Sequence, residues 1–109
     1  KITNKIKSDV VNNLKSEESV DSANLVNRGR MIYITLDFKI GTILDNAKIV
    51  AEKVPTLFSE EELAYYDINI TINAPASDDN AGFTLMGARN SNGSGTIIWN
   101  NLTVKDETE

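Results

Sequence analysis

The first twenty residues repeat hydrophobic positions with a helical period. Ile2, Ile6, Val10 and Leu14 follow one another at four-residue intervals, while lysine, asparagine and serine fill most positions between them. This spacing places the apolar side chains along one stripe, so the pattern predicts an amphipathic helix over residues 2–20. The stretch SEESVDSAN that follows Lys15 breaks the pattern and is typical of a polar turn.

Strict alternation of apolar and polar residues predicts two strands. In VNRGRMIYITLDFKI (residues 26–40) every second residue from Ile32 to Ile40 is apolar, and Gly29 marks a bulge or the entry of the strand. In DINITINA (residues 67–74) the isoleucines alternate in the same way. A period of two with one polar side indicates strands with one face on a core and one in water. The wet face is expected to be rich in threonine, asparagine and aspartate.

A second helix is predicted over residues 41–54, between these two strands. Thr42 is the expected N-cap, and Asp45 stands three residues later, where a capping-box carboxylate belongs. Pro55 has no backbone N–H to continue the helical hydrogen bonds, so the helix should end or kink there.

A short helix is expected to restart after Ser59. Ser59 and Glu62 have the spacing of a capping box, and Phe58 and Leu63 have that of a hydrophobic staple. Three successive glutamates also suit the positive end of the helix dipole. Because capping accounts for these acidic residues, the pattern assigns them no catalytic role.

The C-terminal part predicts two more strands, over residues 83–89 and 96–104. Between them lies an Asn-Gly pair, Asn92-Gly93, which is a hairpin signal because both residue types tolerate positive φ. The surrounding stretch GARNSNGSGTIIWN is therefore interpreted as a turn. A dinucleotide-binding loop would open a helix, and a Walker-type loop would be followed by a lysine.

The predicted order is α-β-α-β-β-β, and the fold class is α+β. We expect a two-layer α/β sandwich with a mixed sheet of about four strands and two helices on one face, the second broken at Pro55. The strand–helix–strand unit over residues 31–74 should form a right-handed parallel crossover, and the last two strands an antiparallel hairpin. Residues 1–104 are expected to form one domain, and residues 105–109 a flexible acidic tail.

Composition removes several kinds of chemistry. The 109 residues include no cysteine and no histidine, so disulfides, thiolate nucleophiles, zinc–thiolate sites and the usual neutral-pH general base are missing. The loop containing Asp78 and Asp79 lacks the alternating order of a calcium loop. We therefore expect no catalytic residue, cofactor or metal. The net charge of −5 also disfavours nucleic acid as a partner.

Aromatic and basic residues indicate a possible interaction surface. Tyrosine and tryptophan offer large apolar area with a polar tip and are common in interfaces. Arginines would join them in one basic patch if the last hairpin lies near the start of the first long strand. The residues of this surface are Arg28, Arg30, Tyr65, Tyr66, Arg89 and Trp99. The alternative for Trp99 is that it only covers an edge of the sheet.

The stretch MIYITLDFKIGTILDNAKIV together with YDINITIN, within residues 31–74, resembles the strand–helix–strand core of small bacterial α/β modules. These modules include the alkaline-shock-type proteins and the ring-building domains of secretion systems. The resemblance implies a role in assembly rather than catalysis.

These observations lead to one expected function and one alternative. We expect a non-catalytic protein-interaction or assembly domain, the soluble part of a bacterial membrane-anchored or surface protein on the extracytoplasmic side of the envelope. The chain starts at Lys1 within a helical pattern, as it would after a removed anchor. Lysines near a membrane span favour the cytoplasmic side, which is the alternative location. The expected partner is another protein or a second copy paired through an edge strand. The alternative function is a small-ligand-binding domain with a pocket between sheet and helices, near Trp99 and Tyr65.

Overall fold

The chain folds into a five-stranded mixed sheet with helices on one face. The structure is a computed structural model, and it describes residues 2–93 and 95–104, with the backbone alone for residues 101–104. The expected acidic tail, residues 105–109, lies outside the described residues. The elements are α1 (Asn4–Lys15), β1 (Val20–Arg28), β2 (Met31–Phe38), α2 (Leu44–Glu52), the 3-10 helix η1 (Val54–Leu57), α3 (Glu60–Tyr65), β3 (Asp67–Ala74), β4 (Phe83–Arg89) and β5 (Ile98–Val104).

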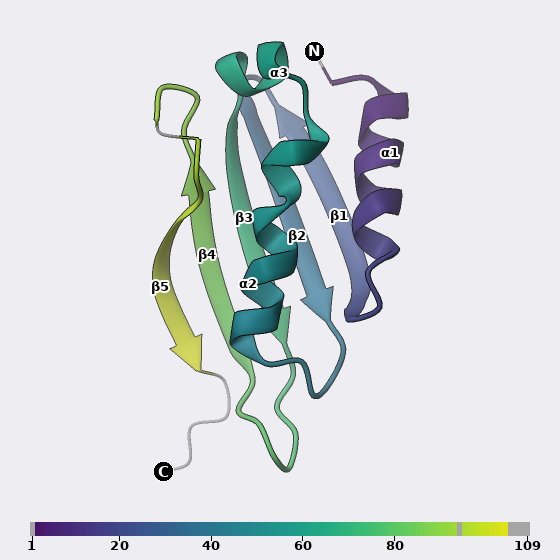
Figure 1. Cartoon of the computed structure of the whole chain (residues 1–109), viewed down its shortest axis with the longest axis vertical. Coiled ribbons are helices and arrows are strands. Elements are labelled where there is room, and N and C mark those ends of the chain that lie inside the picture. The colour runs from purple at the N-terminus through teal and green to yellow at the C-terminus, as the bar shows by residue number, and fades with distance from the viewer. Residues whose placement is uncertain (1, 94, 105–109) are drawn as a thin grey trace.

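The strands lie side by side in chain order, β1-β2-β3-β4-β5. The β2–β3 pair is parallel, and the other three pairs are antiparallel. Figure 1 shows α1 and α2 in front of the sheet, with α1 packed along β1 and α2 along β3. The α+β class, the parallel strand–helix–strand unit and the C-terminal antiparallel pair are thus confirmed, with five strands instead of about four.

The additional strand is β1, in a segment whose first part was predicted as a polar turn and whose last part was joined to the following strand. Gly29, with φ 57°, and Arg30 form a two-residue turn that joins β1 to β2, so residues 26–40 contain the end of β1 and the whole of β2. A register shift between Val20 and Ser22 interrupts the alternation of β1. That bulge conceals the period of two, because Val20 and Leu25 are both buried although they are five residues apart.

The core lies between the sheet and the helices. Isoleucines of β2 and β3 stand opposite one another in register, Ile32 with Ile68 and Ile34 with Ile70, and all four are almost fully buried. The helices cover them with apolar side chains that are also buried: Val10, Leu14, Ala47 and Ala51. The apolar positions of the two strand patterns therefore form the core face of the sheet, as expected, except Ile40, which follows the end of β2 and is 64% exposed.

The helix boundaries differ in part from the sequence expectation. The first helix ends at Lys15 rather than at residue 20, since β1 begins at Val20. Thr42 is not an N-cap: its N–H donates to the carbonyl oxygen of Lys39 (3.1 Å) in the turn after β2, and α2 starts one residue later behind Ile43.

The break at Pro55 and the restart at Ser59 are confirmed. Pro55 lies in the first turn of η1. The Ser59 side chain accepts from the N–H of Glu62 (3.1 Å), and the Glu62 carboxylate accepts from the N–H of Ser59 (2.8 Å), so the capping box is complete.

The loop of the C-terminal hairpin has a different turn from the expected one. β4 ends at Arg89 and β5 begins at Ile98, so the connection is longer than a tight Asn-Gly turn. The N–H of Gly93 donates to the carbonyl oxygen of Asn90 (2.9 Å), while the positive φ among the described loop residues belongs to Gly95, at 94°.

Gly87 lets the Trp99 side chain lie against β4. The two residues are paired across β4 and β5, and a Cβ added at Gly87 would lie 2.7 Å from the Trp99 ring and from Ile97. Trp99 therefore packs on the helix side of the sheet, where its indole N–H donates to the carboxylate of Glu52 on α2 (3.1 Å).

Gly87→Ala is expected to lower the free energy of unfolding by about 1–3 kcal/mol, because the new methyl group overlaps the Trp99 ring. Urea unfolding followed by tryptophan fluorescence measures the change. Gly93→Ala is the control, since an added Cβ there comes no closer than 3.4 Å to its nearest neighbour, the Asn90 carbonyl oxygen. Equal effects of the two substitutions would contradict the described packing of Trp99.

Candidate functional site

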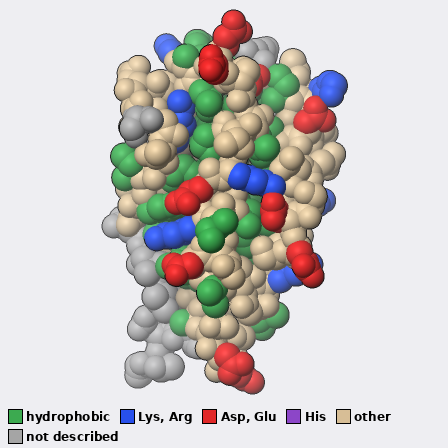
Figure 2. Space-filling view, in the orientation of Figure 1, with side chains coloured by type: hydrophobic (Ala, Val, Ile, Leu, Met, Phe, Trp, Pro, Cys, Tyr) green, Lys and Arg blue, Asp and Glu red, His purple; other side chains and the backbone are tan. Residues whose placement is uncertain are grey.

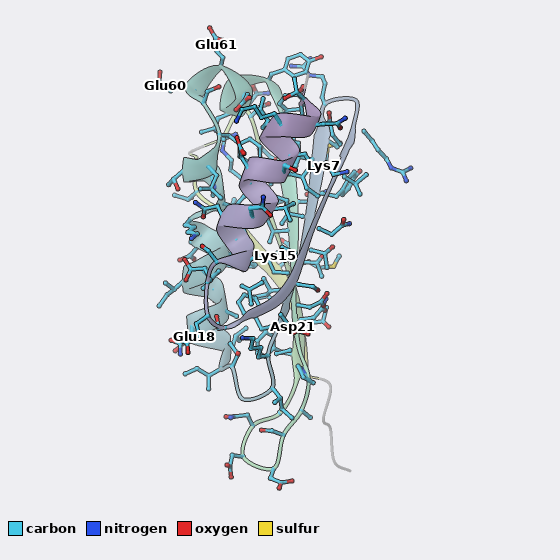
Figure 3. The ribbon with its side chains drawn as sticks, turned by 90° about the vertical axis from the view of Figure 1, so that its right-hand side faces the viewer. Lys7, Lys15, Glu18, Asp21, Glu60 and Glu61 are labelled. Atoms are coloured by element: carbon cyan, nitrogen blue, oxygen red, sulfur yellow. The ribbon has the colours of Figure 1, made fainter. Side chains whose placement is uncertain are left out.

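One face of the sheet has no covering layer among the described residues. Figure 3 views the molecule from the side, with the helices on one side of the strands and no ribbon packed against the other. We call this uncovered side the open face. The charged residues Lys7 and Lys15 of α1 and Glu60 and Glu61 of α3 belong to the helix layer. Figure 2 shows that on the helix side cationic and anionic side chains are interspersed, without a field of one sign.

A hollow of about 650 Å³ lies in the middle of the open face. Strand register brings its lining together: Tyr33 stands beside Asn69 and Thr35 beside Thr71 in the parallel β2–β3 pair, and Met86 of β4 stands opposite Thr71. The pairing of β4 with β5 shifts between Leu85 and Gly87, which leaves Met86 without a paired residue on β5. The lining side chains of the open face are Tyr33, Thr35, Asn69, Thr71, Met86 and Asn100.

The lining is uncharged. It offers hydroxyl groups, amide groups, one aromatic ring and one thioether, but no carboxylate, amine or guanidinium. The Tyr33 and Met86 side chains are 39% and 51% exposed, so both present apolar surface to solvent. Neither of the two belongs to the core, which lies on the opposite side of the sheet.

Below the hollow, polar side chains form a hydrogen-bonded ladder across four strands. The Ser22 hydroxyl donates to one carboxylate oxygen of Asp37 (3.0 Å), and the Asn73 amide donates to the other (3.1 Å). The Thr84 hydroxyl donates to the side-chain amide oxygen of Asn73 (2.7 Å). The ladder satisfies these groups with one another, so it fixes the strands rather than presenting free binding groups.

Four of the six residues of the predicted interaction surface meet at one end of the sheet. The Arg89 guanidinium is buried, and it donates to the backbone oxygens of Leu63 (2.6 Å) and Tyr66 (3.5 Å). Arg30 lies 4.3 Å from the centre of the Tyr65 ring and donates to the Tyr65 backbone oxygen (3.3 Å). Both arginines therefore hold carbonyl groups at the C-terminal end of α3, where a cation is favourable.

The other two predicted residues lie elsewhere. Trp99 packs on the helix side, and Arg28 borders a shallow depression of the open face together with Val26 and Tyr33. The structure thus does not bring the three arginines into one exposed basic patch, because Arg89 is enclosed and used by the backbone.

The same end of the sheet changes the pKa of Asp67, which lies at the start of β3. Its carboxylate accepts from the backbone N–H of Ser91 (2.7 Å), and this hydrogen bond is the main reason that the pKa of Asp67 lies below its ordinary value of 3.8. The positive charges of Arg30 and Arg89 lower the pKa further.

Two other kinds of structure are absent from the described part of the chain. In residues 2–93 and 95–104, no group of three or more histidine, cysteine, aspartate or glutamate residues is placed so that it could hold a metal ion. Within the same residues, no helix is both long enough and apolar enough to span a membrane.

Comparison with known proteins assigns no relative. The chain matches no protein-family model, no curated protein and no solved structure.

Sequence reasoning anticipated a polar sheet face but not the hollow. The alternating polar positions of residues 31–40 include one aromatic residue, Tyr33. An aromatic ring among polar positions was the one sign of the hollow in the sequence. Met86 carried none, because the bulge that leaves it unpaired is visible only in the structure.

Arg89→Met is expected to lower the free energy of unfolding by about 1–3 kcal/mol, because the backbone oxygens of Leu63 and Tyr66 lose a buried donor. Arg28→Met is the control, since Arg28 is exposed, and its effect should stay within about 0.5 kcal/mol. Chemical denaturation of both variants provides the measurement. If Arg89→Met left the free energy of unfolding unchanged, the guanidinium would not hold the end of α3.

Asp67→Asn should reduce the loss of stability in acid. A carboxylate with a lowered pKa in the folded state stabilises the fold above its unfolded pKa, and this contribution disappears as the pH falls through the folded pKa. Asparagine can still accept from Ser91 but does not titrate. Urea unfolding between about pH 7 and pH 2 should therefore show a smaller acid decline for Asp67→Asn than for the natural chain. Asp79→Asn, in an exposed loop, is the control, and equal declines for the natural chain and Asp67→Asn would contradict the assignment.

Proposed function

We propose that this chain is a non-catalytic interaction or assembly domain that holds its partner against the open face of the sheet. The observation that carries the proposal is the open face itself, uncovered by any described element while the opposite face is buried. A sheet normally buries both faces or keeps one face polar and wet. The open face is not simply polar and wet, because it holds a hollow and exposed apolar side chains.

Three exposed apolar side chains support recognition on this face. Tyr33 and Met86 border the hollow, and Ile98 follows on β5, where it pairs with Ala88 and is 62% exposed. Single exposed apolar residues are ordinary, but a group of them on one face is typical of an interaction site. Here the group spans β2, β4 and β5.

The chemistry of the hollow supports binding rather than bond-making. General acid–base catalysis needs a group that changes its protonation near the working pH. The hollow is lined by hydroxyl and amide groups, with the Tyr33 ring and the Met86 thioether beside them, and its lining includes no carboxylate or amine.

A bacterial membrane-anchored or surface protein is the setting that we propose for the domain. The resemblance of residues 31–74 to bacterial assembly modules supports it, including the modules that build secretion rings. The partner in that setting is another protein or a second copy of this chain.

The hollow favours a small-ligand-binding domain as the second candidate. Its volume lies within the roughly 300–1,000 Å³ typical of ligand sites. The position differs from the pocket expected near Trp99 and Tyr65, because the hollow lies on the face away from the helices.

Site-specific photocrosslinking tests the proposed use of the open face. Benzoylphenylalanine is placed at Met86 on the open face or at Ile49 on α2, two exposed apolar positions (51% and 66%), in the full gene product within the organism that encodes it. We expect a discrete crosslinked species from Met86, at least about fivefold more abundant than from Ile49, because hydrophobic contact sites concentrate binding. Crosslinking from Ile49 alone, or turnover of ester, phosphate or glycan substrates by the purified chain, would contradict the proposal.

A further inference from the structure

The hollow holds unused hydrogen-bonding groups. The side chains of Thr35, Asn69 and Thr71 line it, and none of them makes a hydrogen bond within the described part of the chain. A threonine hydroxyl donates one hydrogen and accepts, and an asparagine amide donates two and accepts. Three neighbouring side chains on two strands thus offer both donors and acceptors to an incoming group.

Comparison with the ladder shows that polar side chains without a hydrogen-bond partner are particular to the hollow. Asn73 and Thr84 are of the same residue types, only a few residues along the same sheet face, yet they are bonded to Asp37 and to each other. The free groups at Asn69 and Thr71 therefore do not follow from strand register alone. They occur where Tyr33 and Met86 flank the hollow in place of further polar partners.

The absence of charge in the lining separates ligand classes. An anion would be held by lysine or arginine, and the arginine of the open face, Arg28, borders the adjoining depression and not the hollow. A metal or organic cation would be held by carboxylates, and Asp37 lies in the ladder, already hydrogen-bonded. Single-stranded nucleic acid can stack on exposed aromatics, but it also requires a basic groove for its phosphates.

The same lining disfavours two neutral ligand classes. A wholly apolar ligand would leave the amides and hydroxyls without partners, which costs affinity. An extended peptide gains its affinity from backbone hydrogen bonds at a sheet edge, whereas the hollow lies at the centre of the face, over β2, β3 and β4.

We propose that the hollow binds a neutral sugar of a glycan. A pyranose ring has hydroxyl groups at its edge, which both donate and accept, and a face of C–H groups. The hydroxyls match Thr35, Asn69 and Thr71, and the C–H face packs on the electron-rich face of Tyr33, with Met86 as the opposite wall. This inference rests on the second candidate function, a small ligand bound in the hollow of the open face, and names the chemistry of that ligand.

Nuclear magnetic resonance titration of the isotope-labelled chain tests the inference. The probes are chitotetraose, cellotetraose and maltotetraose, with tetragalacturonate as the anionic control, each at up to about 10 mM, which covers millimolar dissociation constants. At least one neutral probe is expected to shift the backbone signals of β2, β3 and β4 around the hollow, and the side-chain amide signals of Asn69 and Asn100. Tetragalacturonate is expected to cause smaller shifts.

Substitutions locate the binding. Tyr33→Ala should weaken the binding of the neutral probe by roughly tenfold, because the stacking surface is lost, and Thr71→Val, which keeps the shape of the side chain, by roughly fivefold. Tyr65→Ala is the matched control: Tyr65 is exposed to a similar degree (48%) but lies at the end of α3, away from the hollow, so binding should be unchanged. Thr71→Val keeps the test decisive if Tyr33→Ala does not fold.

Several results would overturn the sugar assignment. They are an absence of shifts with every neutral probe, shifts confined to the helix side, shifts that both Tyr33→Ala and Thr71→Val leave intact, or stronger binding of tetragalacturonate. Shifts around the hollow that depend on protein concentration alone, and that Tyr33→Ala removes, would also overturn it, and would show that a second copy occupies the open face. In that case the proposed function would stand, whereas missing crosslinks from Met86 would count against the function itself.

Discussion

The parallel pairing of β2 with β3 is the constraint on which the rest of the structure depends. It aligns Ile32 with Ile68 and Ile34 with Ile70 on one side, and Tyr33 with Asn69 on the other. Parallel strands require a crossover, here through α2, and the crossover must cover the side that carries the isoleucines. The same register therefore creates the dry core and collects the uncharged polar residues on the open face.

Two arginines predicted to lie on an interaction surface, Arg30 and Arg89, instead stabilise the fold. Arg89 enters from β4 and donates to backbone oxygens near the end of α3, while Arg30 stacks on Tyr65 and donates to its backbone oxygen. A helix of six residues has little stability of its own, so external contacts at its C-terminal end and the capping box at Ser59 together hold it in place. The candidate site is left with uncharged side chains.

Local physical signals accounted for most of the fold. The alternation in β2 and β3, the break at Pro55 and the capping box at Ser59 each depend on a few neighbouring residues, and each could be predicted. β1 could not, because its bulge removes the alternation of apolar and polar positions. The N-cap prediction at Thr42 was wrong because α2 begins one residue later, so that Ile43, which has no side-chain acceptor, occupies the N-cap position. The hollow was beyond sequence reasoning for a related cause: only the register of three strands brings its residues together, and periodicity along the chain does not contain such long-range relations.

The central claim is that one side of the sheet is dry and the other is open. Attenuation of isoleucine methyl signals by a soluble paramagnetic agent tests it directly, since the effect depends on the distance of each methyl group from solvent. The account predicts little attenuation for Ile32, Ile34, Ile68, Ile70 and Ile72, which are at most 1% exposed, and strong attenuation for Ile98 on the open face and Ile49 on the helix side. Attenuation of Ile34 and Ile70 to the level of Ile98 would contradict it.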